Sequence, residues 1–184
     1  MKIIKEIIPY IVILIVVILV RMYLITPITV VGSSMDPTLH DKQMLILSKI
    51  SYKIHDIERF DIVVIKKENE EIIKRVIGLP GEYISYEDNK LYINGEYVEE
   101  SYNYGNTKDF DLDYICYVEK YKYYEKNDNF KCEYDKIPDN YYLVLGDNRG
   151  ISKDSRSIGL IKKDDILGKA IVRFWPINKI GSIY

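Results

Sequence analysis

The chain has 184 residues, of which 47% are apolar and 29% are charged, and its formal net charge is −2. This composition is typical of a globular protein and excludes a disordered one. The residues after the first apolar run are enough for one domain with its own core and a small insertion. The sequence has no basic patch, so we expect no nucleic acid among its partners.

The N-terminal region contains an uninterrupted apolar run, IIPYIVILIVVILV, from Ile7 to Val20. A helix that crosses a bilayer needs about 20 residues, and the flanking apolar residues supply the missing length. Tyr10 and Tyr23 stand where interfacial anchors are usual. We therefore expect a membrane anchor over residues 1–25. A buried core helix and a cleaved signal peptide are the alternatives, and the second lacks a small-residue cleavage site.

The charges around the run indicate its orientation. Lys2, Lys5 and the N-terminal amine outweigh Glu6, and positive charge stays on the cytoplasmic side of a membrane. We expect a single-pass protein of the cell membrane, in contact with membrane lipid, whose N-terminus is cytoplasmic. Residues 26–184 would then form an extracytoplasmic domain.

From Thr26 onward the pattern changes to short β-branched segments separated by turn residues. Asn94 and Gly95 form a strong hairpin signal. The predicted strands cover residues 29–31, 44–49, 60–66, 71–77, 82–85, 90–93, 96–98, 141–145 and 168–174. The fold class that we expect is mainly β, with antiparallel sheets forming a partly closed barrel and no long helix after the anchor.

A tyrosine-rich stretch interrupts this pattern at about residues 98–139. Half of the chain's 18 tyrosines lie at positions 96–139, and branched aliphatic residues are scarce there. Such a stretch supplies little core of its own. We interpret it as an insertion or a β-ribbon that packs on the main domain.

Two cysteines, Cys116 and Cys132, lie in this stretch. A disulfide and a pair of free thiols both remain open at this point. The cysteines and the two histidines, His40 and His55, do not have the spacing of metal ligands, so no metal site is expected.

The first segment that suggests chemistry is GSSMDPTL, from Gly32 to Leu39. Gly32 permits a sharp turn after a strand, and Pro37 fixes the backbone that follows. A serine hydroxyl at such a corner can attack a carbonyl, and nearby backbone N–H groups can stabilise an oxyanion. Taken alone, this segment could equally be an ordinary Ser/Pro turn.

The second segment is IIKRVIGLPGE, from Ile72 to Glu82. Strand alternation places Lys74 on the same face as Ile72 and Val76, and burial among apolar groups lowers the pKa of a lysine. At an ordinary pKa of about 10.4, only ~0.04% of a lysine is neutral at pH 7, whereas at a pKa near ~8 roughly 10% is neutral. A buried Lys74 could therefore act as a base. An exposed Lys-Arg pair is the simpler alternative.

The third segment is GDNRGISKDSR, from Gly146 to Arg156, which follows the apolar strand YYLVL. Its turn formers, hydroxyls and Asp/Arg pairs are typical of a rigid, hydrogen-bonded loop. By itself it could also be a solvated loop.

Together the three segments resemble the motifs of bacterial type I signal peptidases, in the same order and with similar spacing. The serine motif is SMDPTL from Ser34, and the lysine motif is KRVIGLPG from Lys74. The third signature is GDNR from Gly146, with Ser152, Asp154, Ser155 and Arg156 at the expected offsets. The resemblance covers nearly the whole chain outside residues 98–139.

The resemblance implies a serine endopeptidase with a Ser/Lys dyad and no cofactor. Ser34 would be the nucleophile, Lys74 its general base, and Ser152 would hydrogen-bond Lys74. Gly32 would form the turn, and the Ser34 backbone N–H would serve the oxyanion. The residues that would support the site from behind are Asp147, Asn148, Arg149, Asp154 and Arg156.

The substrates that the resemblance implies are signal peptides of secreted preproteins, with small residues at the first and third positions before the cleaved bond. The peptide would bind as an added strand beside residues 29–33 and 71–74. A processing peptidase with one dedicated substrate, and a non-catalytic membrane-anchored β domain that binds peptides, are the alternatives. The lysine at position 74 argues against the eukaryotic and archaeal branch, which has histidine there.

Two positions depart from the family pattern. Phe60 stands where the family usually has glycine. Gly32 stands where some members carry a hydroxyl that is thought to assist the oxyanion hole.

Overall fold

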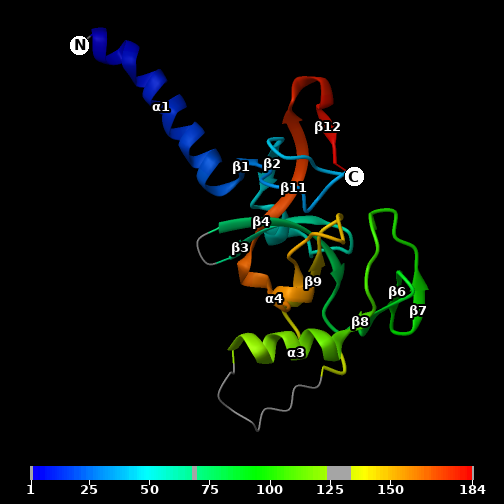
Figure 1. Ribbon diagram of the computed structural model, residues 1–184. Coiled ribbons are helices and arrows are strands. Elements are labelled where there is room, and N and C mark those ends of the chain that lie inside the picture. The colour runs from blue at the N-terminus through cyan, green and yellow to red at the C-terminus, as the bar shows by residue number, and fades with distance from the viewer. Residues whose placement is uncertain (1, 68–69, 124–133, 184) are drawn as a thin grey trace.

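The computed structural model describes residues 2–67, 70–123 and 134–183. Helix α1 (Lys2–Tyr23) projects away from the rest of the protein (Figure 1). Its stretch Glu6–Tyr23 has a mean hydropathy of 2.3 and is 0% buried, and within the described residues it is the one helix long and apolar enough to cross a membrane. A side-chain surface this apolar is unfavourable in water, which is compatible with the predicted anchor.

The larger sheet has eight strands, all paired antiparallel, in the order β1-β2-β11-β3-β4-β9-β10, with β12 beside β11. Its strands are β1 (Ile25–Thr29), β2 (Met44–Ser48), β3 (Ile62–Lys67), β4 (Glu70–Gly78), β9 (Tyr141–Leu145), β10 (Ile161–Lys162), β11 (Ile166–Trp175) and β12 (Gly181–Ser182). The mainly β, antiparallel prediction is confirmed. The path of the sheet ends at β1 and at β10, so the sheet is open and does not close into a barrel.

A second sheet of four strands has the order β7-β6-β5-β8. These strands are β5 (Ile84–Glu87), β6 (Lys90–Ile93), β7 (Glu96–Val98) and β8 (Phe110–Asp111). Asn94 and Gly95 join β6 to β7 with φ angles of 52° and 84°, as a tight hairpin turn requires. This turn confirms the hairpin signal in the sequence.

Among the described residues, three helices follow α1: α2 (Ser51–Ile54), α3 (Leu112–Tyr123) and α4 (Ser155–Ile158), with short 3₁₀ turns at Lys163–Asp165 and Ile177–Lys179. Helix α3 shows that the prediction of no long helix after the anchor was wrong. Asp111 caps it by accepting a hydrogen bond from the Tyr114 N–H at 2.9 Å. Leu112, Ile115 and Cys116 are fully buried at helical spacing. Interspersed tyrosines and charges hid this narrow apolar stripe in the sequence.

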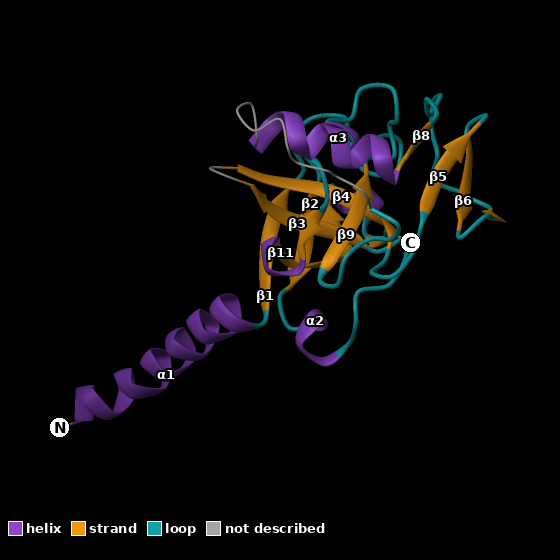
Figure 2. Cartoon of the chain, turned by 90° about the horizontal axis from the view of Figure 1, so that it is seen from below, coloured by secondary structure: helices purple, strands orange, loops and turns teal. Residues whose placement is uncertain are grey.

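The insertion is thus partly helical, α3 lies beside α4 (Figure 1), and Figure 2 shows α3 along one side of the larger sheet. Cys116 of α3 is disulfide-bonded, which decides between the two possibilities that the sequence left open. Cys132, the chain's other cysteine, lies outside the described residues, as does the rest of the insertion between residues 124 and 133.

The core lies on both faces of the larger sheet. Along β3, Ile62 and Val64 join one apolar cluster while Val63 and Ile65 join another. This arrangement explains the continuous apolar run of β3, because a strand covered on both faces does not alternate. A third cluster joins β4 and β9 to the second sheet and α3.

Gly78, at the end of β4, lies where the two sheets meet. A Cβ atom there would lie 2.9 Å from Ile84 Cγ1 and 3.0 Å from the Leu143 Cβ, and closer still to Ile137. The space is therefore filled by the side chains of three buried neighbours.

We expect Gly78→Ala to lower the free energy of unfolding by about 1–3 kcal/mol, because it overpacks this junction. Gly150→Ala is the matched control, since a Cβ at Gly150 has no neighbour within 4 Å. Denaturant unfolding of the full chain in detergent measures both. Equal stability of the two variants would show that the junction is loosely packed.

Candidate active site

Ser34 lies on a turn that continues from β1. Gly32 has a φ of 81°, a left-handed conformation that glycine adopts without strain. Its N–H donates to Asp41 Oδ1 at 2.9 Å, and the Asp36 N–H donates to the Ser33 carbonyl at 3.2 Å. Because the Gly32 N–H is already bonded, Gly32 shapes the turn and offers no donor to an oxyanion.

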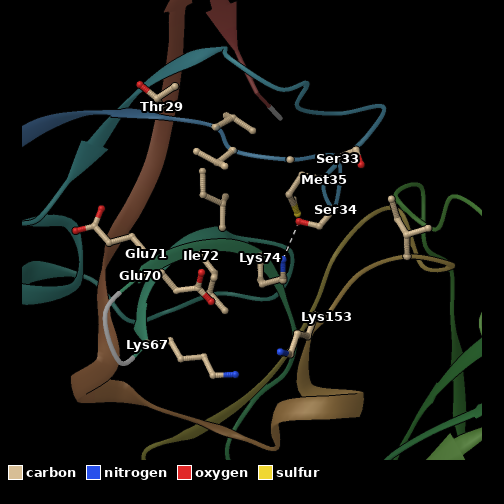
Figure 3. Close-up of a pocket in the computed structure, with 15 residues that line it drawn as sticks. Thr29, Ser33, Ser34, Met35, Lys67, Glu70, Glu71, Ile72, Lys74 and Lys153 are labelled. Atoms are coloured by element: carbon tan, nitrogen blue, oxygen red, sulfur yellow. Dashed lines mark hydrogen bonds between the residues drawn. The ribbon is translucent and has the colours of Figure 1, made fainter.

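The ammonium of Lys74 lies against the Ser34 hydroxyl, and its Nζ donates to Ser34 Oγ at 2.8 Å (Figure 3). Lys74 is on β4 and is only 3% exposed. Burial lowers the pKa of Lys74 from 10.5 to about 8. The nearby carboxylates oppose this shift, and the ammonium of Lys67 adds to it. The carboxylates are those of Asp154, Asp147 and Glu70.

The loop that follows β9 supports Ser34 from behind. The Asn148 N–H donates to the Ser34 carbonyl at 3.0 Å, and Asn148 Nδ2 donates to the Ser33 carbonyl at 3.3 Å. Gly146 lies so close that a Cβ there would be 2.5 Å from the Ser34 carbonyl oxygen. The absence of a side chain at Gly146 therefore lets the loop approach the serine.

A buried ion pair joins this loop to β4. Arg75 donates from Nε to Asp147 Oδ1 at 2.8 Å and from Nη2 to Oδ2 at 2.7 Å, and both side chains are 0% exposed. Such a two-point contact fixes direction as well as distance. The third nitrogen, Nη1, donates to the Phe60 carbonyl at 2.9 Å, and the Tyr102 ring lies 3.6 Å from the guanidinium carbon.

Phe60 has a φ of 70°. This left-handed conformation favours glycine, which gives a physical reason for the glycine usual in the resembled family at this position. Phe60 keeps the conformation while its ring packs 5.8 Å from that of Tyr102.

Asp154 and Arg156 form another ion pair near the site, in which Asp154 is buried and Arg156 is partly exposed. Asp154 caps α4 and accepts from Arg156 Nε at 2.9 Å and Nη2 at 2.8 Å. It also accepts from the Gly146 N–H at 3.0 Å. The carboxylate thus ties the start of the loop to α4, and its charge is balanced by the guanidinium.

Ser152 differs from the prediction. Its Oγ is buried and forms no hydrogen bond within the described residues, so the expected bond to Lys74 is not formed. The Ser152 N–H is held by the Asn148 carbonyl at 3.0 Å, and the side chain lies against Gly146. Lys74 directs its ammonium to Ser34 instead. Ser152 is therefore next to the site but does not orient Lys74 in this conformation.

Sequence reasoning did not single out Arg75 as a supporting residue, although it is the second letter of the lysine motif. It also missed Glu100, which binds Arg149 from within the insertion. One glutamate among the many acidic residues of this stretch carries no signal, because only folding brings it to Arg149. Among the described residues, no group of three or more His, Cys, Asp or Glu could hold a metal ion.

A groove of about 600 Å³ leads to Ser34 and Lys74 (Figure 3). Residues 29–35 line one side, residues 70–74 the other, and Lys67, Ile151 and Lys153 complete it. Strand β9 pairs with β4 only from Arg75 onward, and β1 is the end strand of its sheet. Residues 70–74 thus pair with β3 alone and β1 pairs with β2 alone, so each has one edge with no partner strand in the described part of the chain.

Comparison with known proteins places this site in context. The profile of the family described as "Signal peptidase, peptidase S26" matches residues 3–175. Signal peptidase IB of Staphylococcus aureus is 41% identical over 162 residues, which are 88% of this chain and 83% of that protein. Signal peptidase I of Bacillus amyloliquefaciens is 40% identical over 164 residues, 89% of this chain and 83% of that protein.

A solved structure of a signal peptidase I from Enterococcus faecalis is 33% identical and covers 63% of this chain and 97% of that one, with a TM-score of 0.48. The protein is a serine endopeptidase, a hydrolase. More particularly, the chain belongs to the signal peptidase family, peptidase S26.

We expect Asp147→Asn to lower the free energy of unfolding by about 3–5 kcal/mol, because it leaves Arg75 as a buried, unbalanced cation. Asp139→Asn, at an exposed position, is the control and should change stability by less than about 0.5 kcal/mol. Denaturant unfolding of the full chain in detergent measures both. A loss below about 1 kcal/mol for Asp147→Asn would contradict the structural role given to this ion pair.

Proposed function

We propose that this protein is a membrane-anchored signal peptidase that removes N-terminal signal peptides from secreted preproteins with a Ser34/Lys74 dyad. The observation that carries the proposal is the 2.8 Å contact between Lys74 Nζ and Ser34 Oγ at the end of an open groove. Family membership supports the same activity.

The dyad can perform both steps of peptide hydrolysis. Neutral Lys74 accepts the proton of Ser34 Oγ as the oxygen bonds to the substrate carbonyl carbon. The C–N bond then breaks, Lys74 returns the proton to the leaving amine, and an acyl ester remains on Ser34. Lys74 next deprotonates a water molecule that attacks the ester, and the released serine recovers its proton.

The Ser34 backbone N–H is the oxyanion donor in this proposal. It forms no hydrogen bond within the described part of the chain, and the loop at Asn148 holds the Ser34 carbonyl on the other side. A free N–H that is held rigidly beside the nucleophile can stabilise a developing negative charge.

The substrate binds in the groove as an added strand in our proposal. The unpaired edge of β4 at residues 70–74 and the segment 29–33 supply backbone donors and acceptors on both sides. Near the dyad, Val30, Met35 and Ile72 line the groove, and such apolar neighbours favour small uncharged substrate side chains before the cleaved bond.

The anchor places this groove at the membrane. Helix α1 runs into β1 with only Leu24 between them, so the groove begins close to the end of the apolar segment. The basic N-terminal residues favour a cytoplasmic N-terminus and an extracytoplasmic domain. A signal peptide held in the same bilayer could then extend its cleavage region directly into the groove.

We expect Ser34→Ala and Lys74→Ala each to reduce cleavage of a preprotein by at least about 10³-fold, because the dyad acts as a unit. The measurement is cleavage of a panel of preproteins by the full chain in detergent, with unfolding curves to show that each variant is folded. Activity retained by Lys74→Ala would refute the dyad. Cleavage of a single member of the panel would favour a peptidase with one dedicated substrate.

The pH dependence of kcat/KM for a preprotein, which reports on the free enzyme, should show an acidic limb with its midpoint near the Lys74 pKa of about 8. Protonated Lys74 cannot accept the Ser34 proton, so the rate falls about tenfold per pH unit well below that midpoint. Glu70 raises the pKa of Lys74, so Glu70→Gln should move the midpoint to lower pH. The exposed Glu96→Gln should leave it unchanged, and an unshifted midpoint in Glu70→Gln would contradict the assignment of the limb to Lys74.

A further inference from the structure

The loop that supports Ser34 is itself held by the insertion, for which the family resemblance implied no role. The Tyr104 N–H donates to the Asp147 carbonyl at 3.0 Å, and the Arg149 N–H donates to the Tyr104 carbonyl at 2.9 Å. Tyr104 and Asn148 are thereby paired like residues of two parallel strands. Asn148 lies between Tyr104 of the insertion and the Ser34 carbonyl to which its own N–H donates.

A buried ion pair strengthens this connection. Arg149 Nη2 donates to Glu100 Oε1 at 2.6 Å, and Nη1 donates to Oε2 at 3.3 Å. The Arg149 side chain is 0% exposed and that of Glu100 is 4% exposed. Arg149 Nε also donates to the Gly146 carbonyl at 3.0 Å, so the same guanidinium holds the beginning of the loop.

Two hydroxyls complete the surroundings of this pair. Tyr86 OH donates to Glu100 Oε2 at 2.7 Å and accepts from Arg149 Nη1 at 2.9 Å. Thr107 Oγ1 accepts from the same nitrogen at 3.3 Å. Burial raises the pKa of Tyr86 well above its ordinary value, so this hydroxyl keeps its proton. Among the residues that the structure describes, Glu100 is the only carboxylate bonded to Arg149.

We propose that Glu100 is a positioning residue for peptide hydrolysis, which holds Arg149 and, through it, the loop that fixes Ser34. The proposal rests on the function proposed above. In this proposal, residues 100–107 of the insertion support catalysis by holding the loop at residues 146–149 in place. Glu100 acts through Arg149 and Gly146 and has no contact with the groove.

Glu100 can hold Arg149 in place because the two opposite charges balance each other where little water reaches them. A buried guanidinium without its carboxylate must find water or other acceptors, and moving it releases the Gly146 carbonyl. Asn148 would then no longer be held in register with Ser33 and Ser34. A displacement of about 1 Å at a reacting atom can cost about 10²-fold in rate.

The test compares Glu100→Gln and Glu100→Asp with Glu99→Gln, a control at the exposed neighbouring acid. Cleavage of a preprotein by the full chain gives kcat and KM, at a temperature where unfolding curves show each variant fully folded. For Glu100→Gln we expect kcat to fall at least about tenfold and KM to stay within about threefold, because the groove is untouched. Glu100→Asp, which keeps the charge, should recover part of kcat, and Glu99→Gln should match the unchanged protein.

A second readout is the rate at which a penem acylates Ser34, which needs no preprotein. We expect it to fall in parallel with kcat in Glu100→Gln. A folded Glu100→Gln with kcat and acylation rate within twofold of the unchanged protein would overturn the inference, as would a rise in KM alone. If Glu100→Gln does not fold, the comparison of Glu100→Asp with Glu99→Gln decides by the same criteria.

The two proposals fail in different ways. If the unchanged protein cleaves no preprotein, the proposed function is wrong, and the acylation rates still show whether Glu100 positions Ser34. If the unchanged protein is active and Glu100→Gln is equally active, only the positioning role is wrong.

Discussion

The contact between the Lys74 ammonium and the Ser34 hydroxyl requires a buried lysine, and the residues around the site are arranged to accommodate that burial. The lysine must be buried for its pKa to fall, yet nearby carboxylates raise it again, among them the two buried ones of Asp147 and Asp154. Each of these carboxylates is paired with its own guanidinium, Arg75 or Arg156. Each arginine balances the charge of its carboxylate, and burial remains the largest influence on the pKa of Lys74.

These pairs also determine how the parts of the fold are joined. Arg75 connects β4 to the loop after β9, and Arg149 connects that loop to the insertion. The groove remains open because β9 pairs with β4 only beyond Lys74. Residues 70–74 of β4 pair with β3 on one side, and their other edge pairs with no strand among the described residues.

Much of the fold could be predicted from the sequence, because local patterns carried it. Strand β9 was predicted with its exact bounds, and the turn at Asn94 and Gly95 was predicted from residue type alone. Helix α3 was missed because its apolar stripe is narrow and tyrosines obscure it. The sequence predicted antiparallel sheets in a partly closed barrel, and the antiparallel sheets are confirmed, but how far a sheet closes depends on whether its end strands meet, which no local pattern specifies.

The sequence by itself determined the apolar N-terminal segment, the strand content and the motifs around Ser34, Lys74 and Gly146, because each is a property of neighbouring residues. Only the tertiary structure decided the ion pairs behind the site, Arg75 with Asp147 and Glu100 with Arg149, whereas the pairing of Lys74 with Ser34 was already implied by the family resemblance. It also decided that Ser152 Oγ has no partner among the described residues. These outcomes depend on burial and distance between segments far apart in the chain, which sequence spacing does not specify.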